Sequence, residues 1–232
     1  MAQIFHRSTN TLVRFTLVAA FLGVGVLLWV LARMQSSPYY EEQGIHRVQT
    51  VPFSHAHHVG DEGIDCRYCH TSVEVSPFAG IPPTKTCMNC HSQIWSTAPM
   101  LEPVRQSFRS GTPLVWIRAN DLPDYVYFDH SIHINKGIGC KDCHGPVDHM
   151  PLMYAQNPML MEWCLNCHRQ PEKFLRPRAE VFSMSYQPPS GRSPLAYDGK
   201  TFTDQLTLGS YLRTKYHLRT EQDITSCSTC HR

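Results

Sequence analysis

Five copies of the motif Cys-x-x-Cys-His stand in the chain, and together they use all ten of its cysteines. In this motif two thiols attach a haem through thioether bonds, and the histidine that follows gives the iron its proximal ligand. Zinc sites usually pair two Cys-x-x-Cys units, and a disulfide scaffold does not need a histidine after each second cysteine. The sequence therefore predicts five haem c groups. The predicted attachment residues are Cys66, Cys69, Cys87, Cys90, Cys140, Cys143, Cys164, Cys167, Cys227 and Cys230, and the predicted proximal iron ligands are His70, His91, His144, His168 and His231.

The composition favours a fold with little regular structure. Seventeen prolines are spread over 232 residues, so we expect a multihaem cytochrome c of mostly short α-helices and loops packed around haems, with one N-terminal transmembrane helix. The formal net charge is +2 without a basic run, which gives no nucleic-acid footprint. Five haems would add about ten propionate charges and make the loaded protein acidic.

An uncharged stretch of 18 residues runs from Phe15 to Ala32 and predicts a membrane anchor at residues 15–33. Arg7 and Arg14 precede it and favour a cytoplasmic N-terminus at residues 1–14. The alternative is a cleaved signal peptide, because residues 30–32 loosely resemble a cleavage site. Haem c is attached on the thiol-oxidising side of the cytoplasmic membrane, so residues 34–232 are expected on the periplasmic side of a single-pass protein.

The extracytoplasmic part contains an internal duplication, at residues 51–91 and 126–168. Each copy reads Phe-x-His-x-x-His, Gly-Ile-x-Cys-x-x-Cys-His and Cys-x-Asn-Cys-His in that order. Residues 169–232 form an excursion that ends in the fifth motif. The local patterns predict helices at residues 103–108 and 203–216, a strand at 113–118 and a loop at 187–194.

The duplication also selects the distal iron ligands. His55 and His58 in the first copy correspond to His130 and His133 in the second, whereas His57 has no counterpart. Histidines three residues apart share one helix face, so each pair can reach two irons. We expect the first of each pair to serve the haem just downstream and the second to serve a haem elsewhere. The fifth distal ligand is expected to be Met150, and Met161 and His149 remain open alternatives.

Several segments resemble the pentahaem cytochrome subunit of alternative complex III. They are the N-terminal anchor, the paired Phe-x-His-x-x-His elements, residues 148–151 and 158–168, and the final Cys-Ser-Thr-Cys-His-Arg. The resemblance implies partners: an iron–sulfur subunit, integral membrane quinol-binding subunits and mono-haem cytochrome c subunits. Residues 173–226 carry no matching motif.

The expected function is electron relay from quinol to a soluble acceptor, either a cytochrome c or a small copper protein, with no residue needed as an acid, base or nucleophile. The main alternative is a self-sufficient membrane-anchored quinol dehydrogenase that feeds periplasmic reductases. It would need its own quinol pocket near residues 39–42. A terminal reductase is disfavoured because all five motifs end in histidine, which leaves no altered proximal position.

Overall fold

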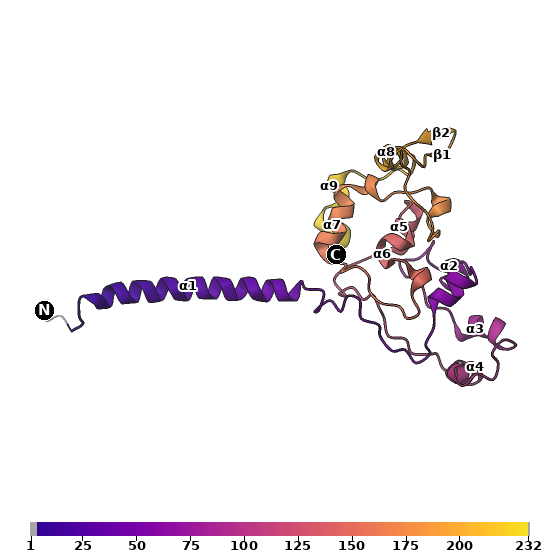
Figure 1. Cartoon of the computed structure of the whole chain (residues 1–232), viewed down its shortest axis with the longest axis horizontal. Coiled ribbons are helices and arrows are strands. Elements are labelled where there is room, and N and C mark those ends of the chain that lie inside the picture. Colours follow the sequence, from indigo (N-terminus) through magenta and orange to yellow (C-terminus); the bar gives the residue numbers. More distant parts are fainter. Residues whose placement is uncertain (1–3, 232) are drawn as a thin grey trace. The chain divides into compact units, whose positions relative to one another are not determined.

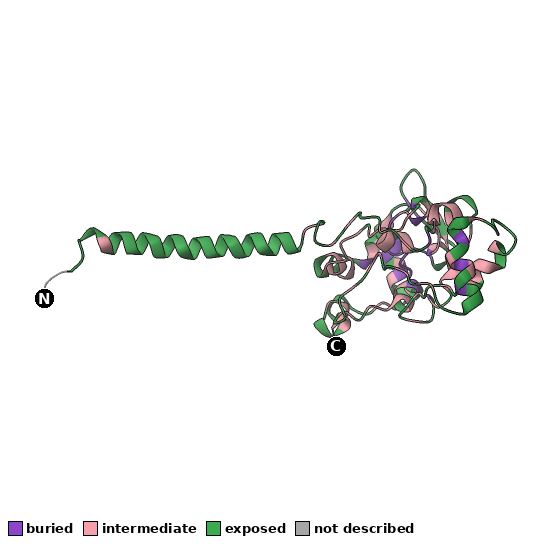
Figure 2. Cartoon of the chain, turned by 90° about the horizontal axis from the view of Figure 1, so that it is seen from below, coloured by how far each residue is buried: buried purple, intermediate pink, exposed green. Residues whose placement is uncertain are grey.

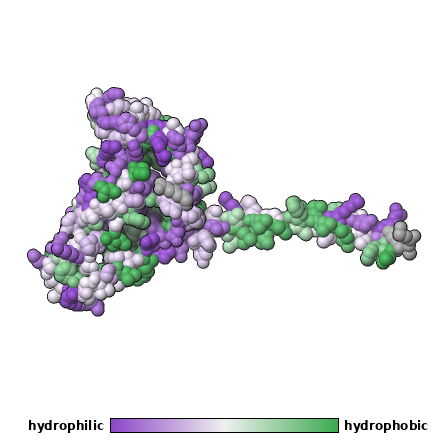
Figure 3. Space-filling view, turned by 180° about the vertical axis from the view of Figure 1, so that it is seen from behind, coloured by the Kyte–Doolittle hydropathy of each residue, from purple (hydrophilic) through white to green (hydrophobic). Residues whose placement is uncertain are grey.

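The computed structural model describes residues 4–231 and divides the chain into two units, residues 1–43 and 44–232. The first unit is dominated by one helix, α1 (Ser8–Gln35), whose side chains are exposed and mostly apolar (Figures 1, 2 and 3). Its 28 residues extend roughly 42 Å, and its most apolar window has a mean hydropathy of 2.5. By length and composition this helix could cross a membrane, as an anchor or as a signal sequence.

The second unit consists of short helices joined by long loops, as the proline content predicts (Figure 1). Its only described sheet is a two-stranded antiparallel hairpin. The helices are η1 (Ala56–Asp61), α2 (Cys66–Cys69), α3 (Thr84–His91), η2 (Pro99–Leu101), α4 (Glu102–Ser110), α5 (His130–Asn135), α6 (Cys140–His144), η3 (Val147–His149), α7 (Met161–Arg169), η4 (Pro171–Lys173), η5 (Arg178–Glu180), α8 (Gln205–Lys215), α9 (Glu221–Ile224) and α10 (Cys227–Cys230), and the strands are β1 (Leu195–Tyr197) and β2 (Lys200–Phe202).

Each Cys-x-x-Cys-His motif forms one helical turn, which places its two thiols on the same face. Motifs one, three and five are the helices α2, α6 and α10, while motifs two and four lie at the C-terminal ends of α3 and α7. A carboxylate caps the first of these turns, because Asp65 accepts from the backbone N–H of Arg67 at the start of α2. Asp129 caps α5 in the same way.

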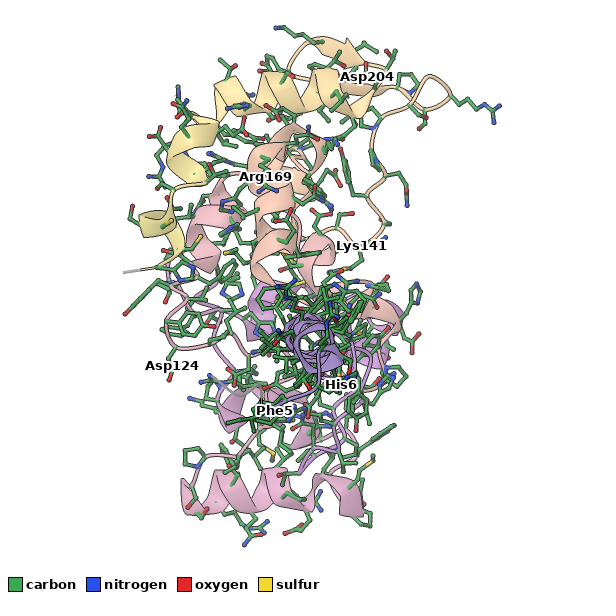
Figure 4. The ribbon with its side chains drawn as sticks, turned by 90° about the vertical axis from the view of Figure 1, so that its left-hand side faces the viewer. Phe5, His6, Asp124, Lys141, Arg169 and Asp204 are labelled. Atoms are coloured by element: carbon green, nitrogen blue, oxygen red, sulfur yellow. The ribbon has the colours of Figure 1, made fainter. Side chains whose placement is uncertain are left out.

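Among the described residues, the buried apolar side chains form three separate clusters rather than one continuous core. Figure 2 shows the buried segments scattered through the second unit. The largest joins Leu208, Leu212 and Tyr216, from α8 and the residue after it, to Leu175 and Phe202. Asp204 caps α8, and its side chain accepts from the backbone of Thr207 (Figure 4). Such small clusters bury little apolar surface for a unit of this length.

Gly209 lets α8 lie directly against η4. A Cβ at this position would overlap the backbone carbonyl of Glu172. We expect Gly209→Ala to lower the free energy of unfolding by about 1–3 kcal/mol, because the overlap outweighs the gain in helix propensity. Thermal unfolding followed at 222 nm tests this, with Ser210→Ala on the exposed face of α8 as control. Equal stability of the two variants would show that the helices can separate without cost.

Most local expectations are confirmed, and one is wrong. Helices occupy Glu102–Ser110 and Gln205–Lys215, where the patterns predict them. Residues 113–118 are not a strand, because their backbone is paired with side chains instead of a neighbouring strand. The Gln49 amide binds both the N–H and the C=O of Ile117, and the Thr50 hydroxyl donates to Val115. The β1–β2 hairpin follows the predicted loop and was not expected.

Candidate haem sites

Three proximal histidines face three of the expected distal histidines. Two imidazoles that bind one iron from opposite sides, each at about 2 Å, have ring centroids about 6 Å apart. The observed separations match this value, so the rings stand where a haem iron would require them. The facing pairs are His58 with His91 at 6.1 Å, His130 with His144 at 6.3 Å and His133 with His168 at 6.0 Å.

His55 lies beside the remaining histidine of the first copy, His70. Burial, and after it the nearby imidazoles of His70 and His58, together lower the pKa of His55 to about 4. A neutral imidazole is the form that binds a metal. Each of the four expected histidines thus lies near a histidine of an attachment motif, and the second of each pair faces the motif further along the chain.

The hydrogen bonds of the rings fit iron ligation. A ligating imidazole uses one ring nitrogen for the metal and donates the other N–H to a neighbouring acceptor. Seven of the nine candidate ligands hold Nδ1 against a backbone carbonyl, which leaves Nε2 free for iron. The bonds are His58–Ser54 (2.8 Å), His70–Gly80 (2.6 Å), His91–Ile94 (3.1 Å), His130–Pro77 (2.7 Å), His133–Asp129 (2.7 Å), His168–Ile224 (2.6 Å) and His231–Tyr125 (3.0 Å).

His144 and His55 are the two exceptions. The Nδ1 of His144 faces the side-chain amide of Asn120 at 3.2 Å, and the Nδ1 of His55 is buried without a partner. Burial, and after it the nearby imidazoles of His130, His70 and His55, together lower the pKa of His144 to about 4. His144 is therefore neutral, as iron ligation requires.

The phenylalanine of each Phe-x-His-x-x-His element holds both histidines. Phe128 stacks on His133 at 4.5 Å and meets His130 edge-on at 4.7 Å. Phe53 repeats this geometry, stacked on His58 at 4.4 Å and edge-on to His55 at 4.9 Å. The sequence repeat contained these two aromatic residues, but their role as supports for the ligand rings became evident only from the geometry.

Contacts between the attachment turns indicate which of them are neighbours. The Asn89 amide at the end of α3 donates to the Tyr68 hydroxyl of α2 at 3.1 Å. The thiols of Cys66 in α2 and Cys140 in α6 hydrogen-bond each other, which lowers the pKa of Cys66 to about 7. The second motif therefore adjoins the first, and the first adjoins the third.

The other attachment turns continue this series. Helix α5 carries the ring facing the third motif and the ring facing the fourth. His168, the last histidine of the fourth motif, bonds to Ile224 just before the fifth motif, and α7 packs on α9. The attachment turns thus follow one another in space as α3, α2, α6, α7 and α10, which differs from their order in the sequence.

The fifth distal ligand lies outside this pattern. Met150 is 1% exposed, and its carbonyl accepts from Ala56 at the start of η1. Met161 is 67% exposed at the start of α7, and His149 is exposed beside Asp148. His231 meets the ring of Tyr125 at 5.8 Å. Ligation of the iron at His231 by Met150, Met161 or His149 stays a prediction.

Residues 126–232 match the protein family described as cytochrome c7 and related cytochrome c. This match covers slightly less than half of the chain, and its structure of short helices and loops is cytochrome c7-like. Haem c is the cofactor of cytochromes c, and the Cys-x-x-Cys-His turns are of the kind that attaches it. The N-terminal apolar helix could span a membrane.

One curated protein to which this chain is similar is the menaquinone reductase, multihaem cytochrome c subunit, of Nitratidesulfovibrio vulgaris. The two proteins are 37% identical over 97 residues, which is 41% of this chain and 45% of the relative. The chain therefore matches somewhat less than half of that protein. The likeness is to a cytochrome subunit of a quinone-linked enzyme.

Proposed function

We propose that this multihaem cytochrome carries five haem c groups and relays electrons within a membrane complex that oxidises quinol. Five complete attachment turns support this number of haems, three of them with a facing imidazole and a fourth with His55 close to its histidine. When bound, a haem supplies an iron that accepts and releases one electron. The chain would hold each iron between two protein ligands, which leaves little room for a substrate to bind at it.

The observation that carries this proposal is the arrangement of facing imidazoles. A catalytic haem keeps one axial position open, whereas rings about 6 Å apart on both sides of an iron close both positions. Distal ligation by His55, His58, His130 and His133 therefore favours electron transfer over reduction of a small molecule. Met150 would complete the fifth site, and a thioether ligand there would raise the potential of that haem.

We further propose that α1 anchors the protein in the cytoplasmic membrane, with residues 44–232 on the periplasmic side. The name of the relative, a subunit of a menaquinone reductase, supports membrane partners that bind a quinone. The resemblance to alternative complex III extends the partners to an iron–sulfur subunit, integral membrane subunits and mono-haem cytochrome c subunits. The acceptor would be a soluble cytochrome c or copper protein.

Native mass spectrometry of the mildly extracted haem protein tests the proposal. We expect a particle several times heavier than this 26.5 kDa chain, with multi-span and iron–sulfur subunits in it. Denaturing mass spectrometry of the chain itself should show five added haems. A lone chain or homodimer that oxidises quinol would instead establish a self-sufficient dehydrogenase, and fewer than five haems would refute the ligand assignment.

A further inference from the structure

Among the five proximal histidines, His144 alone is held by a side chain. The other four bond through Nδ1 to backbone carbonyls, whose strength as acceptors the sequence changes very little. Asn120 lies in the loop before the second copy, 24 positions from His144. The hydrogen bond of His144 is therefore the one that a substitution can strengthen, weaken or remove.

The orientation of the Asn120 amide follows from the needs of the iron ligand. An imidazole that binds iron through Nε2 carries its hydrogen on Nδ1, so Nδ1 is a donor. The Asn120 Nδ2 now faces that atom at 3.2 Å, and an amide nitrogen is also a donor. Its Oδ1 is buried with no partner. If the Asn120 amide turns by 180°, its Oδ1 comes to face the Nδ1–H of His144. The Asn120 Nδ2 then loses its contact with the imidazole nitrogen and no other hydrogen bond to the protein.

We propose that Asn120 is a positioning residue that accepts the Nδ1–H of His144 through Oδ1 and thereby sets the reduction potential of the haem held by Cys140 and Cys143. This inference rests on the proposed haem at that site. The two rings that face each other there, His130 and His144, are nearly parallel, with an interplanar angle of 4°. The bond to Asn120 fixes the plane of His144 about its axis and so maintains this alignment.

The effect on the potential has a definite sign. An acceptor at Nδ1 increases the electron density that the imidazole gives to iron, which stabilises the ferric form and lowers the potential. The contact between Asn120 and His144 is partly buried, which limits the competition of water for the same N–H. The α6 site lies third of five in the spatial series of attachment turns. A change in the reduction potential of this haem therefore alters both the electron transfer to it and the electron transfer from it.

Two substitutions of opposite effect test the proposal on the purified, fully loaded cytochrome. Asn120→Leu removes the acceptor and should raise one of the five potentials. Asn120→Asp keeps the shape, adds a charged acceptor and should lower the same potential. We expect about a tenfold change in the oxidation equilibrium in each direction, which is about 59 mV for one electron. Redox titration followed by visible and EPR spectra measures both shifts.

Asn157→Leu is the matched control. The Asn157 amide donates to the backbone of Asp142 and Cys143 in the same attachment turn and makes no hydrogen bond to an imidazole. Asn157→Leu should lower the melting temperature, and it should not shift one reduction potential relative to the other four. Shifts of the same sign in Asn120→Leu and Asn120→Asp, no shift in either, or an equal shift in Asn157→Leu would overturn the proposal. A haem count below five would instead count against the proposed function.

Discussion

Replacing His58 by alanine is expected to convert one haem in five from low spin to high spin, and that haem is the one held by Cys87 and Cys90. The His58 ring faces His91 at 6.1 Å and is held by Phe53 and by the carbonyl of Ser54. Alanine removes the second strong axial ligand, so the iron becomes five-coordinate or binds water. EPR and the visible spectrum of the ferric protein measure the change.

His57→Ala is the control on the same turn. The His57 ring lies against Trp95 and is about half exposed, so all haems should stay low spin in this variant. The site is identified by combining His58→Ala with Cys87→Ala and Cys90→Ala, which should abolish the high-spin signal. A high-spin signal that persists in the combined variant would place His58 at the first motif and refute the pairing with the second.

Arg176→Met is expected to destabilise the haem domain by about 3–5 kcal/mol at neutral pH, since it leaves a buried carboxylate without its partner. Arg176 is 5% exposed and donates to Asp142, in the third attachment turn, at 2.6 Å. The same carboxylate accepts from the backbone of Gly139. Denaturant unfolding of the loaded protein measures the loss, with the exposed Arg192→Met as control.

The loss should depend on pH in a defined direction. Burial raises the pKa of Asp142 more than Arg176 lowers it, so the folded state keeps this proton to a higher pH than the unfolded state does. Protonation of Asp142 stabilises the folded state fully at a pH below the pKa of Asp142 in the unfolded state. This contribution disappears as the pH rises through the pKa of Asp142 in the folded state. Arg176→Met should therefore cost most at neutral pH and least once Asp142 is protonated. Replacing Asp142 by leucine as well should restore most of the stability, and a loss unchanged in that double variant would contradict the assignment.

The ligand residues follow from the sequence because their information is local. A Cys-x-x-Cys-His turn contains the attachment and proximal residues within five positions, and the duplication separates His55, His58, His130 and His133 from His57. The use of each pair as iron ligands stays a prediction. The first histidine lies near the motif just downstream and the second near the motif beyond it.

Contacts between residues far apart in the chain could not be predicted from the sequence. The spatial order of the attachment turns depends on contacts such as Cys66 with Cys140, 74 positions apart, which no local pattern encodes. Asn120 is one amide in a long loop, and only its distance to His144 marks it. The expected strand at residues 113–118 had suitable β propensity, but propensity does not supply the neighbouring strand that a sheet needs.

The division of the core into three small clusters bears on how the protein is made and disposed of. Around the first attachment turn, Val75 and Phe78 are 83% and 76% exposed in the polypeptide alone. If the proposed haems cover such side chains, a chain that lacks one haem would keep them open to proteases. We therefore expect complete loading to act as a checkpoint in biogenesis. We expect incompletely matured chains to be degraded before they can join a larger assembly and interrupt it.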